Sequence, residues 1–283
     1  MKDTVTLNNG LVIPTIGYGT FKIDDKESEN LVKMAVKTGY RHIDTASYYN
    51  NELGIGKGIA GASAPREDIF LATKIWMDDL GYDKTMKSFE DSMKKLDLEY
   101  LDLLLLHWPR PLALESWKAL EELYNAGKVK AIGVCNYNIR LLQELLDNCS
   151  VKPVINQVEC HPKLQQTDLI EFCHKNDIAV EAWSPIMKGQ VLDVPLLQKL
   201  GEKYGKSPVQ ITLRWHIQRG VIVIPKASSE QRMLDNRDVF DFNLTDEEMA
   251  QIATLDEEKR LGFDPEYIYE NGFDPARDLK NKK

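Results

Sequence analysis

Seven segments of the sequence place a polar or aromatic residue directly after a short apolar run. In DLLLLHWP (102–109), four leucines lead into His107 and Trp108. A buried strand that served stability alone would have no use for an imidazole at its end. The other runs end in Asp44 (followed by Tyr48 and Tyr49), Lys74 (followed by Trp76), Cys135 and Asn136, Gln157 and Glu159, Trp183 and Ser184, and Lys226.

An aspartate, a tyrosine, a lysine and a histidine in one pocket form a proton-transfer group. A tyrosine with an ordinary pKa of about 10 keeps its proton at neutral pH and can act as a general acid. We expect Lys74 to lower the pKa of that tyrosine, Asp44 to pair with Lys74 and keep it charged, and His107 to hydrogen-bond the substrate oxygen. This chemistry suits protonation of an oxygen as a carbonyl is reduced, and a cofactor must supply the hydride.

The segment VIVIPKASSEQRMLDNR (221–237) indicates where a cofactor phosphate binds. A buried strand ends at Lys226, and Ser228 or Ser229 can cap the helix that follows. Helix N-termini bind phosphate through backbone amides. Lys226 and Arg232 add two cations, which favours a dianionic monoester such as the 2′-phosphate of NADP.

The nicotinamide end of such a cofactor would lie among the other strand ends. Trp183 offers a flat face on which a nicotinamide ring can stack. Asn136 and Gln157 could fix the carboxamide of that ring through paired hydrogen bonds.

The order of elements predicts a (β/α)8 TIM barrel made of one domain over residues 1–283. Apolar residues at helical spacing (Met86, Phe89, Met93 and Leu96, for example) alternate with strands that are apolar throughout, which is typical of a parallel sheet covered by helices. The eight predicted strands are IGYG (16–19), RHID (41–44), IFLAT (69–73), LDLLLL (101–106), VKAIGV (129–134), PVINQV (153–158), IAVEAW (178–183) and VIVIP (221–225). In this fold the active site lies at the carboxyl ends of the strands. Asn9-Gly10 predicts an N-terminal hairpin that caps the bottom of the barrel.

Two motifs have structural interpretations. GKGIAG (56–61) fits the dinucleotide-binding pattern G-x-G-x-x-G, but YYNNELGI precedes it instead of a strand. Its glycines are therefore expected to let a short helix pack closely. The pairs Cys160-His161 and Cys173-His174 lack the separated ligands of a structural zinc site, so no metal is expected.

Composition excludes several classes of function. A net charge of −8 disfavours binding to nucleic acid or anionic membranes, and no apolar run reaches the length of a membrane span. The start MKDTVTLNNG lacks the pattern of a signal peptide, and the four cysteines read as reduced thiols. We expect a monomeric cytoplasmic enzyme acting on a small molecule.

The sequence closely resembles the aldo-keto reductase family, above all its short microbial glyoxal, methylglyoxal and 2,5-diketogluconate reductases. The stretches that carry the resemblance are GYRHIDTASYYNNE (39–52), LATKIW (71–76), LDLLLLHWP (101–109), AIGVCNY (131–137), INQVECHP (155–162), EAWSPIMKGQ (181–190) and VIPKASSEQRMLDN (223–236). The resemblance implies NADPH-dependent reduction of aldehydes or ketones.

The resemblance also implies a role for each matching residue. The family tetrad falls on Asp44, Tyr49, Lys74 and His107, because the family's acid lies five positions after the aspartate. The cofactor would contact Gly19, Thr20, Asn136, Gln157, Trp183, Ser184 with the loop behind it, Lys226, Ser229, Arg232, Asp235 and Asn236. Phe21, Trp76 and Trp108 would line the substrate pocket.

The sequence departs from the family pattern in three places. Cys135 and Ala227 stand where many members have serine, which weakens a contact to the carboxamide and removes one donor near the phosphate. The tail after Asn236 is short, and it predicts a shallow, permissive substrate pocket.

Two other functions remain as alternatives. Lys74 could form a Schiff base in an aldolase barrel, although a lysine held charged by Asp44 cannot attack a carbonyl. The chain could instead be a non-catalytic subunit that senses NADPH.

Overall fold

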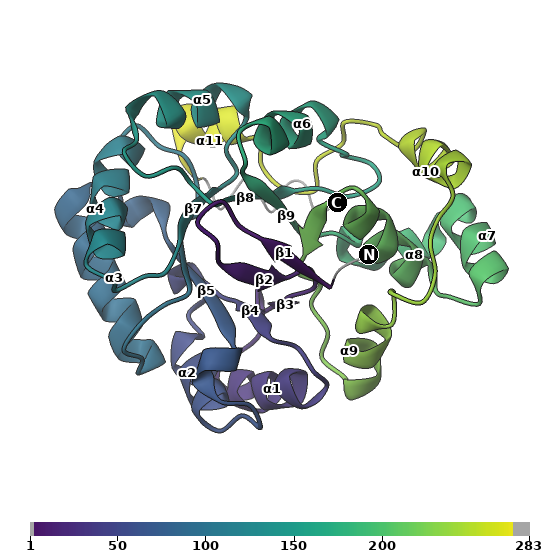
Figure 1. Cartoon of the computed structure of the whole chain (residues 1–283), viewed down its shortest axis with the longest axis horizontal. Helices are drawn as coiled ribbons and strands as arrows, with labels where there is room; N and C mark the ends of the chain where they lie inside the picture. The colour runs from purple at the N-terminus through teal and green to yellow at the C-terminus, as the bar shows by residue number, and fades with distance from the viewer. Residues whose placement is uncertain (1–2, 274–283) are drawn as a thin grey trace.

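Eight parallel strands form the centre of the computed structural model, which describes residues 3–273 (Figure 1). In chain order they are β3 (Tyr18–Gly19), β4 (His42–Asp44), β5 (Phe70–Ile75), β6 (Leu103–Leu106), β7 (Ile132–Cys135), β8 (Ile155–Glu159), β9 (Ala179–Trp183) and β10 (Val221–Val223). Each strand pairs with the next, and a parallel bridge between Ile16 and Val223 joins the last strand to the segment that leads into the first. The predicted (β/α)8 barrel is thereby confirmed.

Helices surround the strands on the outside (Figure 1). They are α1 (Asp25–Lys37), α2 (Glu52–Ala60), α3 (Tyr82–Leu96), α4 (Ala113–Asn125), α5 (Ile139–Asn148), α6 (Thr167–Lys175), α7 (Pro195–Tyr204), α8 (Pro208–Gln218), α9 (Glu230–Arg237), α10 (Asp246–Ala253) and α11 (Pro265–Asn271). The face predicted from apolar spacing packs against the core, as the buried Phe89 and Leu96 of α3 illustrate.

Alternation along the strands divides the buried side chains into two cores. In β6, Leu104 and Leu106 belong to the core shared with the helices, whereas Leu103 and Leu105 belong to the interior of the barrel. Both faces of each strand are therefore buried, which is why the strands read as apolar throughout.

The N-terminal hairpin closes the barrel at the end where the strands begin. Strands β1 (Thr4–Thr6) and β2 (Val12–Pro14) pair antiparallel, and Ile13 packs into the interior core. In the turn, Asn8 Nδ2 donates to the carbonyl of Pro153 and Asn9 Nδ2 to that of Lys130, just before β8 and β7. The predicted cap is confirmed.

The glycines of GKGIAG lie in α2 and its C-cap. A Cβ on Gly56 would clash with the backbone of Leu96, and a Cβ on Gly58 with Val32 of α1. The glycines therefore serve close packing of a short helix, as the sequence indicated.

Candidate active site

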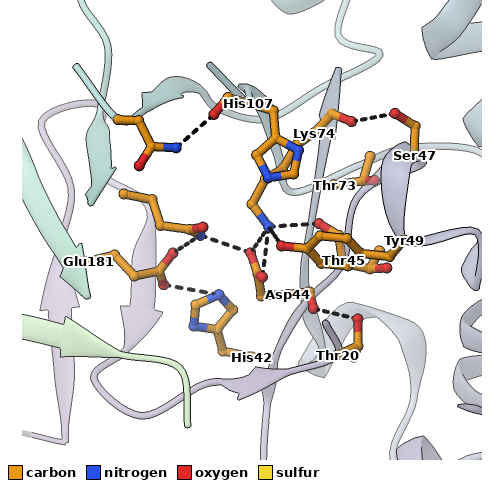
Figure 2. Close-up of polar contacts among 12 residues, drawn as sticks. Thr20, His42, Asp44, Thr45, Ser47, Tyr49, Thr73, Lys74, His107 and Glu181 are labelled. Carbon is orange, nitrogen blue, oxygen red and sulfur yellow. Dashed lines mark hydrogen bonds and ion pairs between the residues drawn. The ribbon is translucent and has the colours of Figure 1, made fainter. Parts of the chain in front are cut away.

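A buried ion pair lies at the carboxyl ends of β4 and β5. Nζ of Lys74 lies 2.7 Å from each carboxylate oxygen of Asp44, 2.9 Å from the carbonyl of Thr45 and 3.3 Å from the hydroxyl of Tyr49 (Figure 2). Lys74 is fully buried and Asp44 is 1% exposed. The two strands are neighbours, so the sheet itself sets this distance.

The surroundings of Lys74 keep its ammonium charged. Burial alone would lower the pKa of Lys74, but the carboxylate of Asp44 and the hydroxyl of Tyr49 together raise it above its ordinary value. A lysine in this state is a cation that polarises its neighbours and is a poor nucleophile.

Tyr49 lies on a single 3-10 turn, Ser47–Tyr49, that follows β4. The hydroxyl of Ser47 donates to the carbonyl of Lys74 at 2.9 Å, and Asn50 ends the turn in the left-handed region. These contacts aim the hydroxyl of Tyr49 at Nζ of Lys74. The family resemblance selected Tyr49 over its neighbour Tyr48, and the fold brings the hydroxyl of Tyr49 to that ammonium.

The expected net lowering of the pKa of Tyr49 was wrong. Burial raises this pKa above its ordinary value, and the Lys74 ammonium offsets only part of the rise. Tyr49 therefore keeps its proton through the neutral range. A buried hydroxyl beside a cation remains able to donate that proton to an oxygen that develops negative charge.

His107 follows β6 and lies beside Tyr49. Its ring centroid lies 5.6 Å from that of Tyr49, and its backbone N–H donates to the carbonyl of Ile75. Burial, and then the charge of Lys74, hold the pKa of His107 well below its ordinary value. Its Nδ1 is buried and has no hydrogen-bond partner among the described residues. The imidazole is thus neutral and available to a bound molecule.

Aromatic rings form one wall beside this polar group. Tyr48 stacks on Trp76 at 3.8 Å between centroids, and Phe273 meets both rings edge-on. Phe263 packs against Phe273 in turn. The tail therefore brings two large apolar groups to this wall, Phe263 and Phe273, more than its sequence suggested. The rest of the tail, residues 274–283, lies outside the described residues, and the shallow pocket stays a prediction.

The other two residues assigned to the substrate pocket differ in burial. Phe21 is 48% exposed and packs against Tyr49, with 5.0 Å between the ring centroids. Trp108 is 8% exposed and belongs to the hydrophobic core.

Asn136 and Trp183 are joined to each other and to His107. Trp183 Nε1 donates to Oδ1 of Asn136 at 2.8 Å, while Nδ2 of Asn136 donates to the carbonyl of His107 at 2.9 Å. Asn136 reaches this position through a left-handed backbone with φ of 62°. Each atom of the amide makes one hydrogen bond here, so Nδ2 keeps a second hydrogen and Oδ1 a second lone pair for a carboxamide.

Gln157 and Cys135 lie deeper in the barrel. Nε2 of Gln157 donates to Asp44 Oδ2 at 2.9 Å and to Glu181 Oε2 at 2.5 Å. Cys135 is fully buried in the interior core, and burial raises the pKa of its thiol well above the ordinary value. A neutral thiol in that position is a weak hydrogen-bond donor.

Two further segments border the strand ends. Ser184 has a φ of 51°, which turns the chain from β9 into the irregular segment Met187–Asp193. Thr20 is buried, and its hydroxyl donates to the carbonyl of Asp44. Gly19 lies so close to the carbonyl of Ile224 that a Cβ would meet it at 2.6 Å, so glycine is required there.

The start of α9 presents two cations. Ser229, rather than Ser228, caps this helix by accepting from the backbone N–H of Arg232. Lys226 and Arg232 are exposed, and neither forms an ion pair within residues 3–273. A helix N-terminus with two unpaired cations fits a phosphate monoester. Further along the helix, Asp235 accepts from Gln231, and Asn236 is buried.

Sequence reasoning missed two buried groups below Gln157. Glu181 in β9 and His42 in β4 are fully buried, with Oε1 and Nε2 separated by 3.5 Å (Figure 2). The signal was present, since a charged residue interrupts the apolar run IAVEAW and an imidazole stands inside RHID.

Glu159, noted only as a strand end, holds the C-terminal segment. Its carboxylate accepts from the backbone N–H groups of Leu261 at 2.5 Å and of Gly262 at 3.2 Å. Gly262 in turn packs so tightly on Trp183 that a Cβ would meet the indole at 2.5 Å.

Residues 3–273 contain neither a membrane-spanning helix nor a cluster of metal ligands. No helix in that range is long and apolar enough to cross a membrane. Within the same range, no group of three or more His, Cys, Asp or Glu side chains could hold a metal ion.

Comparisons with known proteins identify the family of the chain. Residues 15–257 match the model of the aldo/keto reductase family. The chain is 46% identical to a glyoxal reductase of Bacillus subtilis (strain 168), over 95% of this chain and 98% of the relative. It is 43% identical to a methylglyoxal reductase of Escherichia coli (strain K12), over 93% and 96%. An aldo-keto reductase of Bombyx mori, solved in complex with NADP, superposes with a TM-score of 0.89 at 35% identity, covering 95% of this chain and 98% of that one.

Proposed function

Because this chain belongs to the aldo/keto reductase family and reduces carbonyl groups with NADPH, we propose that Tyr49 is the general acid of its reaction. The observation that supports this role is the contact of one ammonium, that of Lys74, with both Asp44 and the hydroxyl of Tyr49. The ring of His107, which follows β6, lies against the ring of Tyr49.

Each residue of this group has a separate task. Asp44 holds Lys74 in place and charged, and Lys74 stabilises negative charge as the hydroxyl of Tyr49 gives up its proton. His107, as a neutral imidazole, orients the carbonyl oxygen by a hydrogen bond. A nicotinamide bound at this site would supply the hydride for the carbonyl carbon.

For the cofactor we propose the residues that the family resemblance implies. Lys226, Ser229 and Arg232 would bind the 2′-phosphate at the start of α9, with Asp235 and Asn236 toward the adenine. The nicotinamide end would lie against Trp183, within reach of Asn136 and Gln157. Ser184 with its loop, and Gly19 with Thr20, would border the dinucleotide between these ends.

We propose small dicarbonyls as substrates, with glyoxal and methylglyoxal as the first to test and sugar-derived keto acids as a further class. The names of two relatives support this choice. The aromatic wall of Trp76 and Tyr48 beside His107 would cover a compact carbonyl compound.

Titration with NADPH and then with NADH, followed by tryptophan fluorescence, tests the cofactor assignment, and methylglyoxal added last tests the chemistry. Tighter binding of NADPH and its oxidation on addition of the aldehyde are expected. Tight binding without turnover of any carbonyl would favour the alternative of a cofactor-sensing subunit. The aldolase alternative has little support, because Asp44 holds Lys74 charged.

We also propose that the chain acts as a single-domain monomer in the cytoplasm. Its cysteines are free thiols, and three of the four are buried. Light scattering on the purified protein would measure the mass against that of one chain.

A further inference from the structure

Four side chains that line the barrel interior form a connected polar group beneath Lys74 (Figure 2). Gln157 on β8 bridges Asp44 on β4 to Glu181 on β9, because its Nε2 donates to one carboxylate oxygen of each. Glu181 then lies against His42, which returns to β4. The group thus spans the barrel from one side to the other.

The Gln157 amide has one orientation that satisfies this arrangement. If its oxygen and nitrogen were exchanged, the amide oxygen would face the ionised carboxylate of Asp44, and that contact is repulsive. With both Nε2 hydrogens donated, Oε1 is left as the acceptor that a bound carboxamide N–H can reach. Glu181 and Asp44 together determine which end of Gln157 meets the cofactor.

Glu181 has few groups to neutralise a charge. Its carboxyl is fully buried, and Oε1 has no hydrogen-bond partner among the described residues. Within residues 3–273, the cation that acts on Glu181 is the ammonium of Lys74, which both oxygens of Asp44 already share. The titratable groups that face Glu181 from the surrounding strands are His42 and Asp44 on β4, Lys74 on β5 and Cys135 on β7.

The protonation of this group follows from that surplus of negative charge. Burial, and then the charge of Asp44, raise the pKa of Glu181 to about 8. Burial lowers the pKa of His42 to about 3, so the imidazole is neutral. At pH 7 the proton therefore resides on Glu181, with Nε2 of His42 as the acceptor nearest to Oε1.

We propose that Glu181 is a positioning residue of the reductase, which orients Gln157 for the cofactor and whose charge sets how readily Tyr49 donates its proton. The proposal rests on the proposed function of the site. When Glu181 loses its proton, a second negative charge lies beside Asp44 and Lys74. That charge makes the phenolate of Tyr49 harder to form, so reduction slows as the pH rises through the titration of Glu181.

The first experiment measures the carboxyl group without cofactor or substrate. Infrared spectra of the purified protein, labelled with 13C-glutamate, are expected to show a protonated carboxyl band that disappears with a midpoint near pH 8. The band should be absent from Glu181→Gln. It should persist in the control Glu248→Gln, which alters a buried carboxyl in α10 that is paired with Lys203. A band unaffected by Glu181→Gln would overturn the proposal.

The second experiment separates positioning from charge. Replacement by alanine removes the acceptor for Gln157 and is expected to weaken NADPH binding about tenfold, whereas Glu181→Gln keeps an acceptor and should bind more tightly than the alanine variant. In wild type, kcat for reduction should fall about three- to tenfold through the titration, and Glu181→Gln should lack that fall. Superimposable pH profiles of kcat would contradict the proposal. Failure of the chain to reduce any carbonyl would instead overturn the proposed function, and the infrared and binding results would still test Glu181.

Discussion

Tyr48 lies flat against Trp76, with ring planes 15° apart, whereas the next residue along the chain turns its hydroxyl toward Lys74. One 3-10 turn thus gives two adjacent tyrosines different surroundings. Tyr48 is 38% exposed and contributes a ring to the aromatic wall.

Replacing Tyr49 by phenylalanine removes the proposed proton donor and keeps the ring. We expect kcat for methylglyoxal to fall by about 10²- to 10⁴-fold, because that is the usual contribution of a general acid. The affinity for NADPH, measured by tryptophan fluorescence, should change less than about threefold, since the hydroxyl contacts Lys74 and not the proposed cofactor residues. Tyr48→Phe is the matched control and should retain most of the activity. Equal loss of turnover and NADPH affinity in Tyr49→Phe would mean that the residue supports the cofactor site instead.

Removal of either cation at the start of α9 tests the phosphate assignment. Lys226→Ala and Arg232→Ala should each weaken NADPH binding about 10- to 100-fold, as expected for a lost charge-assisted hydrogen bond, and leave NADH binding nearly constant. Lys37→Ala is the control, because it removes an exposed cation of α1 that pairs with Glu230 of α9. Parallel losses for both nucleotides would remove the phosphate from this position.

Asp44→Asn leaves the buried ammonium of Lys74 without its counter-ion. Breaking a buried pair on one side costs about 3–5 kcal/mol, so unfolding in guanidinium chloride should occur at markedly lower denaturant concentration. The double variant Asp44→Asn with Lys74→Met should be more stable than Asp44→Asn alone. A double variant that is less stable than the single one would show that charge is not the cause.

Glu159→Ala should release the segment that Glu159 holds over Trp183. Lys259 and Arg260, at the edge of this segment, are trypsin sites, and we expect their cleavage to accelerate about tenfold because the open form becomes more populated. Glu257→Ala, which removes only an exposed ion pair with Lys163, is the control and should be cleaved like wild type. Equal rates in all three proteins would mean that other contacts hold the segment.

The raised pKa of Glu181 makes the stability of the fold depend on pH. The folded protein binds this proton more tightly than the unfolded chain does. The protonated Glu181 therefore contributes its full share of the free energy of unfolding below pH 4.5, and this share is lost as the pH rises to about 8. The free energy of unfolding of Glu181→Gln should therefore rise relative to wild type across this interval, by at most about 1.4 kcal/mol per pH unit. Denaturant unfolding at pH 5, 6.5 and 8 would measure this difference, and a constant difference would contradict it.

The strands and the positions of the polar strand ends were predictable because both depend on local sequence. An apolar run such as LDLLLL reports burial on two faces, and the residue after it is carried to the common edge of the sheet. The sequence could not indicate that Glu181 and Asp44 share one amide, since β9 and β4 are far apart in the chain and are not adjacent strands of the barrel. Nor could it give the net pKa of Tyr49, which depends on a competition between burial and Lys74. The contribution of Phe273 to the pocket arises from the path of the tail, which local patterns do not determine.

Closure of the barrel between its last strand and the first depends on few hydrogen bonds. Gly17 N–H donates to the carbonyl of Val223 at 2.8 Å, and Val223 N–H to that of Thr15 at 2.9 Å. Proposed cofactor contacts lie on both sides of this seam, with Thr20 on one side and Lys226 on the other. A bound dinucleotide would therefore act as a clasp across the seam, and we expect the amide hydrogens of Gly17 and Val223 to exchange with deuterium more slowly once NADP is present.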